Sequence, residues 1–166
     1  MRDPLLWRER FTVDRGPDDG VRAGDAVIDV GADGRPLLVG VIERAGKRTS
    51  TVLTLCNGAL RLSARLGTNG AVGFVNAGAE RGIDGTLPFG YLPPGTEYRP
   101  GEAALTTGSE AGIPPGLVVG ELVETDVPGT IFDHRVHLSG RLKPAADFDG
   151  LRFVMICRNR SEPERP

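Results

Sequence analysis

The stretch GEAALTTGSEAGIPPGLVVGELVE, from Gly101 to Glu124, indicates the fold most directly. It contains two short apolar runs, Ala103–Thr107 and Leu117–Val123, and the segment between them holds three glycines and two prolines. Proline fixes φ near about −65° and glycine tolerates positive φ, so a segment rich in both forms a tightly shaped connection. The stretch therefore predicts two β-strands joined by a rigid turn.

The same pattern of short apolar runs between turn residues extends along the whole chain. In Leu60–Leu66, leucines and an alanine alternate with arginines and a serine, which is typical of a strand with one face in water. Only Ala145–Gly150 suggests a brief helical turn. The pattern predicts an all-β barrel or sandwich. The expected strands are Arg10–Asp14, Ala26–Val30, Leu37–Arg44, Thr51–Cys56, Leu60–Leu66, Ala71–Asn76, Ala103–Thr107, Leu117–Glu124, Arg135–Leu142 and Arg152–Cys157.

Composition argues against several function classes. The 166 residues carry a formal net charge of −2, and the lysines and arginines are scattered, so nothing favours a nucleic-acid partner. No apolar run approaches the roughly 20 residues that a membrane span needs. The N-terminus, MRDPLLWRER, lacks the apolar core of a signal peptide. The chain as given is therefore expected to be soluble.

The cysteines and histidines do not form a metal-binding pattern. Cys56 and Cys157 lie far apart, each at the end of an apolar run, and are interpreted as free buried thiols; a disulfide between two strands stays open. His134 and His137 are three residues apart, which on a strand places them on opposite faces. We expect no metal, no cofactor and no phosphate-binding loop.

Ser109 offers one catalytic alternative. Ser109, with His134 and the adjacent Asp133, would make a barrel-type hydrolase. A serine triad requires convergence in space, and an Asp directly before the His cannot easily orient it within a strand. The preferred interpretation of Ser109 is a turn serine, and the chain is expected not to be an enzyme.

Aromatic residues are the best candidates for partner binding. Phe89, Tyr91 and Tyr98 lie in a segment rich in glycine and proline, Gly78–Gly101, which shows little strand pattern. This segment holds either a hairpin at Gly82–Leu92 or a junction between subdomains. The three aromatics either contact a partner or fill the end of a barrel or the seam between subdomains.

Five segments, taken in order, carry a resemblance to a known family. They are RDPLLWRERFTVDRGPDDGVRAGDAVI (Arg2–Ile28), LLVGVIERAGKRTSTVLTL (Leu37–Leu55), GTLPFGYLP (Gly85–Pro93), GEAALTTGSEAGIPPGLVVGEL (Gly101–Leu122) and RLKPAADFDGLRFVMIC (Arg141–Cys157). Together they resemble the periplasmic β-domain of the MreC family, the bacterial rod shape-determining proteins of cell elongation. The resemblance extends from Arg2 to Cys157.

The resemblance implies a fold of two small β-barrels, distantly like chymotrypsin-type barrels. The corresponding subdomains would be residues 1–68 and 69–157, with a disordered tail at 158–166. The last strand either completes the second barrel, which is favoured, or returns to the first.

The resemblance also implies a role. It points to a non-catalytic scaffold that organises peptidoglycan synthesis during cell elongation and maintains cell shape. The implied partners are the elongation-class penicillin-binding transpeptidase, MreD, indirectly MreB, and further copies of the chain in dimers or filaments. The family's domain is periplasmic and is anchored in the inner membrane by an N-terminal helix and coiled coil that this sequence does not contain. A soluble ligand-binding module is a further alternative, and it would need a large concave pocket.

Overall fold

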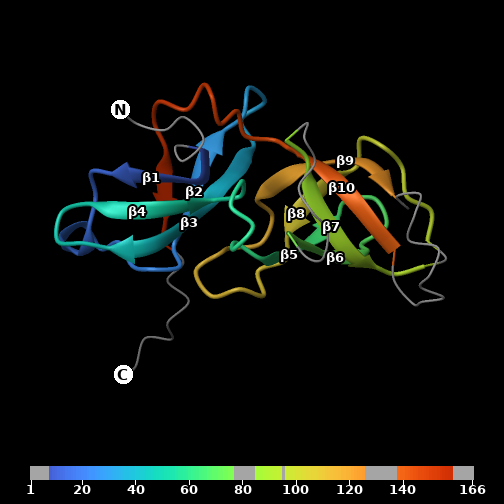
Figure 1. The fold of residues 1–166 in the computed structure, drawn as a ribbon, viewed down its shortest axis with the longest axis horizontal. Helices are drawn as coiled ribbons and strands as arrows, with labels where there is room; N and C mark the ends of the chain where they lie inside the picture. Colours follow the sequence, from blue (N-terminus) through green and yellow to red (C-terminus); the bar gives the residue numbers. More distant parts are fainter. Residues whose placement is uncertain (1–7, 77–84, 95, 126–137, 159–166) are drawn as a thin grey trace.

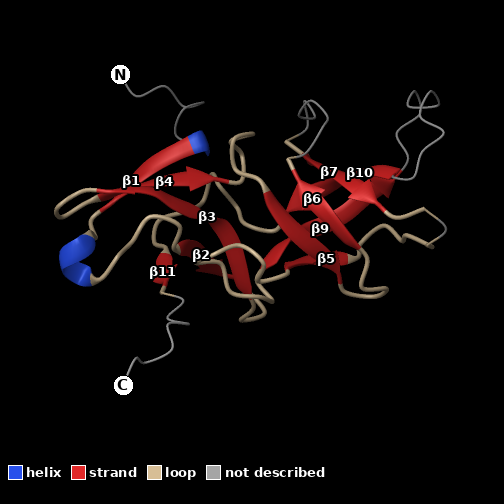
Figure 2. Cartoon of the chain, turned by 90° about the horizontal axis from the view of Figure 1, so that it is seen from below, coloured by secondary structure: helices blue, strands red, loops and turns tan. Residues whose placement is uncertain are grey.

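The computed structural model describes residues 8–76, 85–94, 96–125 and 138–158, and it is built almost entirely of β-strands (Figures 1 and 2). Within these residues, helix is confined to a short 3-10 segment, η1 (Pro17–Asp19), and to the residues directly before the first strand. The strands are β1 (Arg10–Val13), β2 (Ala26–Val30), β3 (Pro36–Ala45), β4 (Ser50–Thr54), β5 (Leu62–Leu66), β6 (Val72–Val75), β7 (Leu87–Leu92), β8 (Ala103–Thr106), β9 (Val118–Thr125), β10 (Leu138–Pro144) and β11 (Met155–Cys157).

Six of these strands form a closed barrel. Their order is β9–β10–β7–β6–β5–β8, and antiparallel pairing of β8 with β9 closes the ring. Closure leaves no free edge among these strands. Alternate residues point inward and fill the barrel with side chains, Phe89 being the largest that is fully buried.

The other five strands form a second group, in the order β1–β4–β3–β2–β11. The two groups lie next to each other in Figure 1. They are joined by a single parallel pairing, Leu37 of β3 opposite Val118 of β9. Within the described residues, β1 pairs only with β4, and β11 pairs only with β2, so these two strands are the edges of the group.

The turn between β8 and β9 connects the two groups. The N–H of Ala26, in β2, donates to the carbonyl of Gly112 at 3.2 Å. Gly112 has φ +84°, and a Cβ there would lie 2.3 Å from the carbonyl oxygen of Gly24. Only glycine satisfies both conditions. The Thr106 hydroxyl donates to the carbonyl of Pro114 at 2.7 Å and accepts the N–H of Leu117 at 3.0 Å, which closes the turn. The stretch Gly101–Glu124 thus shapes one barrel and holds it against the neighbouring strands.

Most of the sequence-based expectations for strands are confirmed, with differences of one or two residues at many ends. The expected strand Arg152–Cys157 begins three residues later, at Met155, and the first three residues of the expected strand Arg135–Leu142 lie outside the described residues. The exception is β7, which was predicted only as one arm of an alternative hairpin. The expected helical turn at Ala145–Gly150 is a non-helical turn, because the Asp147 carboxylate accepts the N–H groups of Asp149 and Gly150 at 3.2 Å. The alternation expected for Leu60–Leu66 is present, although Ser63 is buried.

The grouping of the strands differs from the expected division at residue 68. β5 lies before that position, yet it pairs with β6 and β8 and so belongs to the closed barrel. β11 pairs with β2, so the last strand returns to the first group and does not complete the second barrel. In both cases the partner strand, which is distant in the sequence, decides the grouping. Of the tail expected to be disordered, residues 158–166, Arg158 is described and its guanidinium donates to the carbonyl of Asp19 at 3.2 Å. Residues 159–166 lie outside the described residues.

Candidate interaction surface

An apolar patch lies on the outside of the closed barrel, formed by Val72 and Phe74 of β6 and Tyr91 of β7. In β6, Gly73 and Val75 point into the barrel, so the intervening residues point outward. Val72 is 41% exposed, Phe74 46% and Tyr91 56%. This combination of large exposed apolar side chains on adjacent strands is typical of a protein-binding surface.

A β-bulge turns Tyr91 outward. Leu138 of β10 pairs with Leu92 and Gly140 with Phe89, so β7 uses one residue more than β10 over the same interval. Tyr91 has φ +61°, which is rare for a bulky side chain and is consistent with a bulge. The ring of Tyr91 meets that of Phe74 edge to face, with centroids 6.1 Å apart and planes at 88°. The two rings therefore support each other at the surface.

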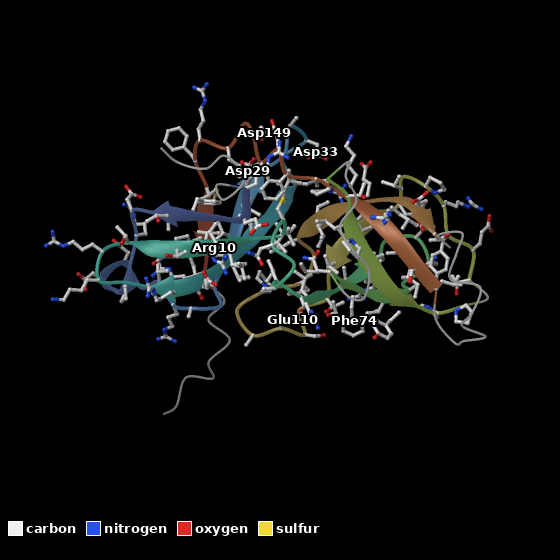
Figure 3. All side chains as sticks on the ribbon, viewed as in Figure 1. Arg10, Asp29, Asp33, Phe74, Glu110 and Asp149 are labelled. Carbon is white, nitrogen blue, oxygen red and sulfur yellow. The ribbon has the colours of Figure 1, made fainter. Side chains whose placement is uncertain are left out.

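Polar neighbours border the patch on β5. Arg65, which is exposed, lies opposite Val72, and Ser63 lies opposite Phe74. Arginine beside exposed aromatic rings is a frequent composition at binding hot spots. Figure 3 shows the side chains of Phe74 and Glu110 on the same side of the molecule.

Glu110 fixes the border of the patch. Its Oε1 accepts the backbone N–H of Ser63 at 2.7 Å and the Ser63 hydroxyl at 2.9 Å. The Ser63 hydroxyl also lies 2.6 Å from that of Thr107. The turn before β9 is thereby bound to β5, the strand that neighbours the patch.

The structure separates the three aromatics predicted to bind a partner. Phe89 is 1% exposed and belongs to the barrel core, so its side chain fills the barrel. Tyr98 is half-buried and its hydroxyl donates to the carbonyl of Pro93 at 2.5 Å; burial raises the pKa of this phenol. Only Tyr91 presents most of its side chain to solvent. Phe74 and Val72 were not predicted from the sequence as binding residues. The alternation in AVGFVN, which places both on one face of a strand, was the signal for them.

Ser109 is placed on the exposed turn before β9. Its hydroxyl accepts a hydrogen bond from that of Thr107 at 3.0 Å, and its backbone N–H donates to the same oxygen at 3.2 Å. The residues proposed to complete a triad, Asp133 and His134, lie outside the described residues, as does His137. Ser109 thus has the contacts of a turn serine.

Neither cysteine forms a disulfide, and both are half-buried. Burial, followed by the nearby Asp25 carboxylate, raises the pKa of the Cys157 thiol. Across the described ranges, no three His, Cys, Asp or Glu side chains cluster in a way that would hold a metal ion. In those same ranges, no helix has the length and apolarity of a membrane span.

Comparison with known proteins identifies the family. The family model described as "Rod shape-determining protein MreC, barrel core" matches residues 1–158. The cell shape-determining protein MreC of Listeria monocytogenes is 28% identical over 169 residues, which cover 97% of this chain and 52% of the relative. The MreC of Escherichia coli is 26% identical and is covered over 42% of its length. The chain thus spans about half the length of the curated relatives it matches.

Solved structures show the same fold. The Listeria MreC structure superposes with a TM-score of 0.82 at 24% identity, covering 98% of this chain and 73% of that one. A complex between a penicillin-binding protein, PBP2, and MreC from Helicobacter pylori matches with a TM-score of 0.60 at 18% identity, covering 82% of this chain and 76% of that one. Because the family model matches almost the whole chain, this protein belongs to the MreC family of rod shape-determining proteins.

Proposed function

We propose that this chain is the extracytoplasmic, non-catalytic part of a scaffold for bacterial cell elongation. Membership of the MreC family over residues 1–158 is the observation that carries the proposal. In the proposal, a segment N-terminal to the barrels anchors the protein in the inner membrane, and the two strand groups act as subdomains in the periplasm. MreD, further copies of the chain and, indirectly, MreB complete the assembly.

The proposed direct partner is the elongation-class penicillin-binding protein. The Helicobacter pylori complex supports this choice, since it contains an MreC of the same fold together with PBP2. The proposed contact surface is the patch of Val72, Phe74 and Tyr91. Its edge-to-face rings are already ordered, so binding would bury apolar area with little further loss of side-chain freedom.

The test is a titration of the purified chain with the periplasmic part of the same organism's elongation transpeptidase, followed by biolayer interferometry. The variants F74A and Y91A should each weaken binding by about tenfold, the effect of removing a hot-spot aromatic. The matched control is V30A in β2, because Val30 is a similarly exposed apolar residue, at 49%, on the other strand group.

The results distinguish an error in the proposed contact surface from an error in the proposed partner. Unchanged affinity in both variants would place the contact elsewhere on the chain. Absence of binding by the wild-type chain, with binding by the longer membrane-anchored protein, would assign the partner site to the region outside this chain.

A further inference from the structure

A groove lies between the two edges of the five-stranded group. It has a volume of about 710 Å³ and is bordered by residues of β1 on one side and by the segment leading into β11 on the other. In Figure 2, β1 and β11 lie on opposite sides of this group. The volume is in the range of known ligand sites, about 300–1,000 Å³.

The lining residues indicate that the edge of β1 faces the groove. Phe11 to Arg15 line it without interruption, and so do Leu151 to Val154. Successive side chains of an extended chain point in opposite directions, so a single face would contribute only every second residue. In β1, the consecutive lining residues Phe11, Thr12 and Val13 therefore indicate that the edge of this strand borders the groove. Leu151–Val154, which precede β11, form the opposite wall.

The backbone of one wall is unpaired. The N–H and C=O groups of Leu151–Val154 form no hydrogen bond with any other described residue, and strand pairing begins only at Met155. Such groups are a template for a further strand. The neighbouring barrel closes with six strands, whereas the described residues of this group form five strands with no pairing between β1 and β11.

The side chains indicate the chemistry of an added strand. Apolar residues such as Val13, Phe148 and Val154 line the groove, and Phe153 beside them is 87% exposed. Three arginines, Arg15, Arg152 and Arg158, border it, against two acids, Asp14 and Asp19. Arg15 pairs with Asp14 at 3.4 Å, and Arg158 donates to the carbonyl of Asp19 at 3.2 Å.

Arg152 differs from the other two arginines, because it has no hydrogen bond or ion pair with any described residue. Among the described residues, the groove therefore has a mixed lining of apolar and polar residues, with an excess of positive charge at its border.

We propose that this groove binds an extended segment of a partner protein, with alternating apolar and acidic residues, which inserts as a sixth strand between β1 and the Leu151–Cys157 segment. Main-chain hydrogen bonds to both walls would supply affinity, and the apolar and charged side chains would supply specificity. This inference does not depend on the barrel patch or on the transpeptidase as its partner.

The test uses fluorescein-labelled peptides of seven residues, EVEVEVE and its charge-inverted counterpart KVKVKVK, in anisotropy titrations with the full chain. EVEVEVE should bind at least about tenfold more tightly. The variant R152E should weaken its binding by about tenfold. The matched variant R61E, directly before β5 of the closed barrel, should leave it unchanged, because Arg61 is equally an exposed arginine but lies outside the groove.

Two further measurements identify strand insertion. N-methylation of the odd or of the even peptide residues removes donors toward one wall or the other, so each series should abolish binding. Bound EVEVEVE should slow backbone amide exchange in residues 11–15 and 151–157 and leave β5–β8 unchanged.

Equal binding of both peptides, or of neither, would overturn the proposal. So would binding that tolerates either N-methyl series, since the peptide would then not bridge both walls. Slow amide exchange in the two segments without any peptide, together with a mass in sedimentation that rises with protein concentration, would mean that a second copy of the chain occupies the groove. That result would also overturn the proposal.

Discussion

Asp25 and Glu102 occupy the same position in two copies of one turn, one in each strand group. Each carboxylate is almost fully buried, at 7% and 8% exposure, and accepts the backbone N–H three residues earlier, that of Arg22 at 2.9 Å and of Arg99 at 3.4 Å. The preceding glycines, Gly24 and Gly101, have φ +92° and +90°.

The strands that follow repeat the relationship. The Gly24 N–H donates to the backbone carbonyl of Ile42 at 2.8 Å, and the Gly101 N–H donates to the backbone carbonyl of Leu122 at 2.7 Å. In return, the Ile42 N–H donates to the backbone carbonyl of Asp25 at 2.9 Å, and the Leu122 N–H donates to the backbone carbonyl of Glu102 at 2.8 Å. The pair β2–β3 thus corresponds to the pair β8–β9. The same turn, with the same hydrogen bonds, precedes the first strand of each pair.

The first prediction concerns these carboxylates. D25A should lower the free energy of unfolding by about 1–3 kcal/mol, because it removes a part-buried hydrogen bond from a backbone N–H to a charged acceptor. E102A should lower the free energy of unfolding by less, since the hydrogen bond from the Arg99 N–H is longer, at 3.4 Å, than the bond from the Arg22 N–H. Urea denaturation followed by circular dichroism measures both, with D18A as control because Asp18 is exposed and outside both turns. A smaller effect for D25A than for E102A would contradict the ranking.

The second prediction concerns the barrel core. A Cβ at Gly73 would lie 2.8 Å from the Phe89 ring and 2.9 Å from Leu92, closer than real contacts allow. G73A should therefore lower the free energy of unfolding by about 1–3 kcal/mol, the usual cost of overpacking. Thermal unfolding would show the lost stability. In the double variant G73A/F89L, the smaller side chain at position 89 makes room for the added Cβ and should restore part of that stability. The control is G58A, whose added Cβ meets no atom within 4 Å and should be nearly neutral.

The third prediction concerns Asn76, which has φ +60° and is 6% exposed. Its Nδ2 donates to the carbonyls of Leu55 at 3.1 Å and Leu60 at 2.8 Å, on either side of the turn between β4 and β5. N76A loses these bonds and strains the backbone, so it should cost about 2–4 kcal/mol of unfolding free energy in urea melts.

A second variant at this position separates the two effects. N76G loses the same bonds but accepts positive φ, so it should cost about 1 kcal/mol less than N76A. Equal losses for the two variants would assign the whole effect to the hydrogen bonds.

The fourth prediction concerns the pH dependence of Cys157. Burial, together with Asp25, raises its pKa, so the folded state holds the thiol proton more tightly than the unfolded state does. Its contribution to stability is complete below about pH 8, near the ordinary pKa of a thiol, and is lost as pH rises through the folded value.

The measurement is the rate of alkylation by iodoacetamide against pH in the C56S variant, which keeps Cys157 as its single thiol. The midpoint should lie above that of the same chain in urea. D25N should move it part of the way back, since burial remains. A folded midpoint at or below the unfolded one would refute the assignment.

The local alternation of residues predicted most of the strands, but it predicted the candidate surface only in part. Phe89 and Tyr91 are two residues apart, so a regular strand would place both on the same face. The bulge opposite β10 reverses this: Phe89 is buried in the barrel and Tyr91 faces solvent. A bulge depends on the register with a partner strand and leaves little trace in the sequence around it.

The sequence by itself determined that the chain is all-β, where its glycine and proline turns lie, and which family it belongs to. These follow from residue type, since alternation and backbone preference are properties of a few neighbouring residues. Only the tertiary structure decided that β5 joins the closed barrel, that β11 returns to β2, and that no described strand pairs β1 with β11. Strand pairing joins residues far apart in the chain, as Cys157 with Ala26, and its outcome depends on how all the strands pack together.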